Sequence, residues 1–124
     1  MKESTMLTIS SLLTILFASL HVADDAARGL DPARPASLML VPILVVWLYA
    51  ALVLAGRRSG SVILLVGSLL GAVIPVLHFQ GQRIGEIATS SGGFFFIWSL
   101  FAVGVTALFS FILAARGLWS QRRG

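Results

Sequence analysis

Apolar residues gather in four long runs, separated by short segments that hold most of the charged side chains. A helix that crosses a bilayer needs roughly 20 mainly apolar residues. None of the four runs contains Lys, Arg, Asp or Glu. The pattern therefore predicts an all-α, polytopic membrane protein, a four-transmembrane-helix bundle that forms one domain over residues 1–124. The predicted spans are 6–23, 38–55, 61–79 and 94–115, with outer loops over 24–37 and 80–93.

The first run is N-terminal and follows Lys2, so a cleaved secretory signal peptide is an alternative to a first span. Its apolar stretch is long for a signal core, however, and Glu3 offsets the single basic residue. No clear small-x-small cleavage site precedes Asp24. We therefore expect an uncleaved first span.

The distribution of basic residues predicts the orientation of the spans. Loops on the cytoplasmic side of a membrane carry an excess of Lys and Arg. One side of the predicted bundle would hold Lys2, Arg57, Arg58, Arg116, Arg122 and Arg123, and the other side Arg28, Arg34 and Arg83. This bias predicts that both termini are cytoplasmic. Aromatic residues 94–96 would then mark the outer interface, and the absence of cysteine together with the small size fits a bacterial inner membrane.

The composition excludes several functional classes. The chain is 57% hydrophobic and 11% charged, with a mean hydropathy of +0.95, which is incompatible with an ordinary soluble domain. The net charge of +4 comes from basic clusters that flank apolar runs, so we expect lipid headgroups as partners and no nucleic acid. The absence of cysteine excludes thiol redox chemistry. The spans lack the embedded carboxylate that a small proton-coupled exporter needs, and no selectivity-filter sequence indicates a channel.

The outer loops contain signals of local structure. Gly29 suits the position just after a helix, and Asp31 followed by Pro32 suits the start of the next one. We therefore expect the first helix to continue beyond the membrane. In the second outer loop, Ile84 and Ile87 have helical spacing and predict a short interfacial turn.

Small and aromatic residues indicate how the spans pack. Gly67 and Gly71 form a small-xxx-small pair, which lets a neighbouring backbone approach closely. This pair is typical of either a dimer contact or a seam within one bundle, and we favour the seam. Trp47 lies near the middle of the second span and is expected to pack against the next helix, although a ligand stacking on it is an alternative. The Ser and Thr residues within the spans are expected to bond to their own helices.

The candidate functional site is polar and lies at the outer face. His21 ends the first span and His78 ends the third, and both spans run outward, so the two histidines should lie at the same depth. Asp24 and Asp25 follow His21 at i+3 and i+4, which places all three on one helix face. Glu86 lies in the following outer loop and could join them. We also expect Asp24 to pair with the arginine four residues later.

These residue types indicate three kinds of chemistry. His21, His78 and Asp25 together suit a divalent metal such as zinc, iron or manganese. Two imidazoles at matched depth suit haem b. Acid–base work on a lipid headgroup is a third version. None of the spacings is as specific as an HExxH motif, and the sequence alone favours the plainer interpretation that these are interfacial polar residues without a ligand.

Two functions follow from these interpretations. The first is a binding or catalytic protein that holds a metal, haem or lipid-like ligand at the outer site, with Trp47 as a further candidate contact. The second is an accessory or scaffold subunit that packs against another membrane protein, or against its own copies, through its glycine-bearing face. The sequence does not decide whether the protein is an enzyme.

Overall fold

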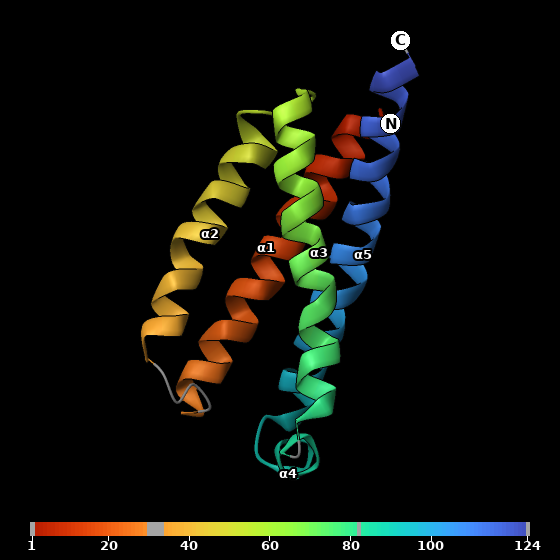
Figure 1. Cartoon of the computed structure of the whole chain (residues 1–124). Helices are drawn as coiled ribbons and strands as arrows, with labels where there is room; N and C mark the ends of the chain where they lie inside the picture. The colour runs from red at the N-terminus through yellow and green to blue at the C-terminus, as the bar shows by residue number, and fades with distance from the viewer. Residues whose placement is uncertain (1, 30–33, 82, 124) are drawn as a thin grey trace.

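The computed structural model describes residues 2–29, 34–81 and 83–123, and every regular element in them is a helix (Figure 1). The two chain ends lie at one end of the structure, and the short helix α4 lies at the opposite end, here called the α4 end (Figure 1). The elements are α1 (Glu3–Ala27), α2 (Arg34–Leu52), α3 (Arg58–Gln80), α4 (Ile84–Thr89) and α5 (Gly93–Arg123).

Three of these helices, α1, α3 and α5, are long and apolar enough to cross a membrane. The apolar part of α2, Met39–Leu52, is shorter. Large apolar side chains on the helices point outward, as shown by Leu77 at 60% and Val105 at 66% exposure. Water would not tolerate so large an apolar surface, so the structure indicates a helical membrane protein.

Small side chains allow α1, α3 and α5 to pack closely. A Cβ atom on Gly71 of α3 would lie 3.0 Å from Ala107 of α5 and 3.5 Å from Thr14 of α1. The ring of Pro75 in α3 lies over Gly104 of α5. A Cβ added to Gly104 would be only 2.7 Å from that ring. These contacts place the α3–α5 backbones near one another, as expected where dispersion rather than water exclusion holds helices together.

Helix α2 packs on this group through Trp47 and two fully buried alanines, Ala50 and Ala51. The indole of Trp47 lies over Gly67 of α3, where an added Cβ would be 2.9 Å from the ring. Gly67 and Gly71 are therefore both contacted from within the chain, as expected for a seam inside one bundle. The same contact confirms that Trp47 packs against the next helix. Beside it, α2 and α3 border an apolar cavity of about 430 Å³.

The helix ends agree with the sequence in some places and differ in others. Gly29 has a φ of +64° directly after the C-cap of α1, so the first helix does run on past residues 6–23 as expected. The predicted interfacial turn is α4. Helix α2 ends at Leu52, earlier than the predicted span 38–55, because the chain turns through Gly56 with a φ of +76°. The expected cap at Asp31 and Pro32 lies outside the described residues.

Candidate metal centre

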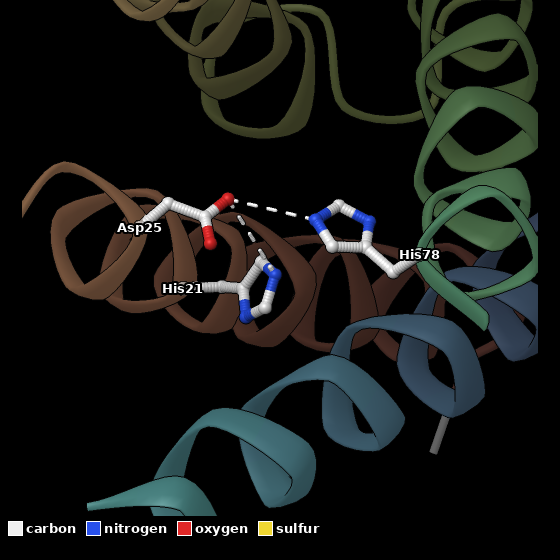
Figure 2. A group of neighbouring side chains, drawn as sticks. All are labelled: His21, Asp25 and His78. Carbon is white, nitrogen blue, oxygen red and sulfur yellow. Dashed lines mark ion pairs between the residues drawn. The ribbon is translucent and has the colours of Figure 1, made fainter. Parts of the chain in front are cut away.

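Two helices bring three potential metal ligands together at the α4 end. His21 and Asp25 lie on successive turns of α1, and His78 faces them from the last turns of α3 (Figure 2). Asp25 Oδ2 is 3.5 Å from His78 Nε2 and 3.9 Å from His21 Nε2. One ligand atom from each residue lies within 4.8 Å of the others. Atoms that share a zinc ion at about 2.0–2.2 Å lie on the order of 3–4 Å apart, so small side-chain rotations would close this set around an ion.

Hydrogen bonds on the far side of each imidazole set its tautomer. His78 Nδ1 is 2.9 Å from the Ile74 carbonyl oxygen, which can only accept, so Nδ1 carries the proton. His21 Nδ1 is 2.9 Å from Ser99 Oγ, and the Ser99 hydroxyl itself donates to the Phe96 carbonyl. Ser99 must therefore accept from His21 Nδ1–H. In both neutral rings the lone pair is on Nε2, the atom that faces Asp25.

Two polar atoms of the cluster are buried and accept no hydrogen bond from the described residues. His21 is 2% exposed, and His21 Nε2 and Asp25 Oδ1 are buried without a hydrogen-bond partner among the described residues. A carboxylate and two imidazole lone pairs that point at one another repel, and a buried polar group without a partner costs on the order of 1–3 kcal/mol. A positive charge placed between them, either a proton or a metal ion, would remove this conflict.

An aromatic ring and a pocket surround the cluster. The Phe96 ring of α5 lies 4.8 Å from the His21 ring and 6.0 Å from the His78 ring, centre to centre. A pocket of about 400 Å³ opens beside the cluster, and Asp25, His78 and Phe96 form part of its wall. His21 lies behind these residues. The pocket therefore gives access to the side chains of Asp25 and His78.

Arg28, near the end of α1, makes several contacts beside the cluster. Its Nε atom donates to Asp24 Oδ2 at 2.7 Å, which confirms the expected i, i+4 pair. The same guanidinium donates to Ser90 Oγ at 2.9 Å and to the Ser91 carbonyl at 3.1 Å. It also lies 5.7 Å from the centre of the Phe96 ring. Arg28 thus ties the end of α1 to the connection between α4 and α5, and it engages Asp24 outside the cluster.

The structure does not bring every candidate residue into this cluster. Glu86 is exposed on α4, with its Oε2 4.0 Å from Arg83 Nε. Trp47 is buried on α2 against Gly67. Of the candidate residues, His21, Asp25 and His78 converge. The other three, Asp24, Glu86 and Trp47, lie outside this cluster.

Two contributors were missed by the sequence analysis. Ser99 and His21 are 78 positions apart, and nothing in the sequence distinguishes Ser99 from the other serines of the spans. Phe96 was assigned with its neighbours to an interfacial belt, but it is 1% exposed, whereas Phe94 is 83% exposed. A three-residue aromatic run on a helix must point in different directions, and only the helical period indicates that one member faces inward.

The fold and the cluster together define the class to which this chain conforms, a helical membrane protein with a partly buried His–Asp–His group between two helices. No protein-family model, curated protein or solved structure matches the chain.

Proposed function

We propose that this chain is a four-span inner-membrane protein that binds a divalent metal ion at its outer face through His21, Asp25 and His78. The observation that carries the proposal is the convergence of two imidazole Nε2 atoms on Asp25 Oδ2, with both Nδ1 atoms held by hydrogen bonds. Hydrogen bonds of this kind orient histidine ligands in known metal sites. A proton alone would relieve the repulsion as well, so metal binding is the point to test.

The donor set and its surroundings favour a small ion over haem b. Two imidazoles and one carboxylate suit zinc, iron or manganese, and three protein ligands leave one position open. Bis-histidine haem ligation needs the macrocycle to lie between the two rings. Here the ring centres of His21 and His78 are only 5.1 Å apart, and Phe96 packs against both. An ion fits this space without displacing Phe96.

Charge distribution supports four spans with cytoplasmic termini. The two chain ends lie at the same end of the structure (Figure 1), as an even number of crossings requires, and α2 would supply the fourth crossing. Lys2, Arg116, Arg122 and Arg123 are near that end, and the positive-inside rule favours the cytoplasm for it. The metal site would then face the periplasm.

The scaffold alternative has less support. It was based on a glycine-bearing face that would be free to contact a partner. Gly67 is covered by Trp47, and Gly71 is covered by Ala107 and Thr14, so this face is used inside the chain. No other described feature argues specifically for a partner protein.

Zinc binding to the purified protein in dodecyl maltoside tests the proposal, with Asp25→Asn compared with Asp24→Asn. The two changes remove the same charge one residue apart, but Asp24 is bonded to Arg28 and lies outside the cluster. Wild type should bind one zinc ion per chain. Asp25→Asn should weaken binding by more than about 100-fold, because even the loss of an outer hydrogen bond costs roughly 10–100-fold. Asp24→Asn should stay within a few-fold of wild type.

Native mass spectrometry of the same samples would identify any metal or haem retained during purification. Equal zinc affinity in Asp25→Asn and wild type, or no binding by folded wild type at micromolar zinc, would refute the metal site.

A further inference from the structure

We infer that the pocket beside the cluster binds the anionic head of an amphiphile, a phosphate or carboxylate group attached to a hydrocarbon chain, in a metal-dependent manner. The inference rests on the proposed metal site and names the kind of ligand that would complete it. It is supported by the two chemically different sides of the pocket, by the charge balance, and by the position of the pocket beside the exposed apolar surface of α3.

The pocket has a polar side and an apolar side. Its volume of about 400 Å³ is within the range of ordinary small-molecule sites. The polar wall includes Asp25 and His78, which are two of the three proposed metal ligands, and Arg83. The remaining wall is mainly apolar and is formed by Leu77, Ile84, Ile87 and Phe96, together with Gly81. A ligand that satisfies both sides must have a charged or polar head and an apolar body.

The charge of the head follows from the charges in the wall. Without a metal, the wall carries one negative charge on Asp25 and one positive charge on Arg83, and Glu86 adds a negative charge beside Arg83. A divalent ion on the cluster would leave an excess of positive charge and an open coordination position that accepts an oxygen donor. An anionic oxygen group meets both requirements. This explains why binding should depend on the metal.

Arg83 is available to contact such a head. Its closest acidic partner is Glu86, at 4.0 Å, and both side chains are strongly exposed. An exposed ion pair of this length contributes little. A guanidinium binds phosphate or carboxylate through two parallel hydrogen bonds, which is a stronger and more directional contact. Arg83 would therefore exchange a weak partner for a strong one.

The opening of the pocket suits a hydrocarbon chain. Leu77 lies in the wall and is 60% exposed on the surface of α3, which is apolar enough to face lipid. The pocket thus lies where the apolar surface of a spanning helix meets the charged residues of the α4 end. A ligand could place its chain along α3 and its head at the metal. A free anion such as inorganic phosphate would contact only the polar wall.

The test measures ligand binding to the zinc-loaded protein in dodecyl maltoside, a detergent without phosphate. Three probes separate head from chain: didecanoyl phosphatidic acid, didecanoyl glycerol and inorganic phosphate. Phosphatidic acid should bind best, and removal of zinc should abolish its binding. Arg83→Gln should weaken it by about tenfold or more, as expected for the loss of a charge-assisted contact. Arg58→Gln, which removes an exposed arginine from the other end of α3, is the matched control and should match wild type.

The outcomes distinguish this inference from the proposed function. If zinc binds but phosphatidic acid does not, the inference is wrong and the metal site stands. If zinc fails to bind, the metal site is wrong and this inference falls with it. Equal affinity for phosphatidic acid and inorganic phosphate would show that the hydrocarbon chain does not contribute to binding. The inference of an amphiphilic ligand would then be wrong, and the pocket would bind a free anion. Equal affinity for didecanoyl glycerol would show that the charge of the head is irrelevant, which also overturns the inference.

Discussion

Buried polar groups in the middle of the bundle and at its α4 end differ in how fully they are hydrogen-bonded. In the middle, Thr14 donates to the Ser10 carbonyl at 2.8 Å and Ser68 to the Leu65 carbonyl at 3.0 Å, each within its own helix, and Ser110 of α5 donates to Ser10 Oγ of α1 at 2.8 Å. At the α4 end, the polar atoms of His21 and Asp25 face across helices, and two of them have no hydrogen-bond partner in the described chain. The examples in the middle are therefore hydrogen-bonded inside the bundle, whereas the α4 end combines unpartnered atoms with a carboxylate, as expected if a cation binds there.

Among the residues that the structure describes, two groups in the middle also have no hydrogen-bond partner, Ser11 Oγ and Trp47 Nε1. Both are neutral, and burying a neutral group costs far less than burying an unpaired carboxylate. The difference between the two regions is thus mainly one of charge. A charged group left in this state is a stronger indication of a missing ligand than an unpaired hydroxyl or indole.

Of the changes that test this contrast between regions, the largest expected effect separates two serines with similar burial, Ser99 and Ser68. Ser99→Ala removes the acceptor that orients His21 and should weaken zinc binding by about 10–100-fold. Ser68→Ala removes a hydroxyl bonded only within α3 and should leave zinc affinity unchanged. Titration calorimetry measures both constants. If the two variants bind zinc equally well, the hydrogen bond to His21 does not position a ligand, and the contrast between the regions would be lost.

The next effect concerns stability and should appear only in the middle of the bundle. Gly67→Ala would place a Cβ 2.9 Å from the buried ring of Trp47. Overpacking costs about 1–3 kcal/mol, and the gain in helix propensity returns about 1 kcal/mol. We therefore expect a net loss of about 1 kcal/mol, measured by unfolding in mixed micelles of sodium dodecyl sulfate and dodecyl maltoside.

Gly117→Ala is the control for this change, because nothing lies within 4 Å of the added Cβ. It should stabilise α5 by up to about 1 kcal/mol. Zinc affinity should be unaffected in both variants. A stabilised Gly67→Ala protein would show that the contact between α2 and α3 is loose enough to absorb a methyl group.

The smallest effect tests how the α4 end is held closed. Arg28→Gln removes three hydrogen bonds. The bond to Asp24 is partly buried, and the bonds to Ser90 and Ser91 are exposed. Amide hydrogen exchange over residues 84–92 should rise by about twofold to fivefold, the scale of an exposed ion pair. Arg116→Gln breaks a more exposed ion pair, with Glu3 at the other end of the structure, so it should leave this segment unchanged. Equal exchange in both variants would mean that Arg28 does not hold the connection.

The sequence was most informative about features that act within one helix or along the bilayer normal. Apolar runs predicted the helices, and spacing predicted both the Asp24–Arg28 pair and the shared face of His21 and Asp25. The reason is that helix geometry couples positions three and four apart, and an apolar run places its end at a definite depth. Glu86 could not be excluded in this way, since its loop position left its direction open.

What the sequence by itself determined is therefore the helical, membrane-type architecture and the pairing of His21 with Asp25 on one helix face. Only the tertiary structure decided that His78 turns toward that pair, that Ser99 holds the His21 ring, and that Trp47 covers Gly67. Each of these depends on how separate helices are rotated about their axes. That rotation results from the packing of many side chains at once, so no local spacing in the chain encodes it.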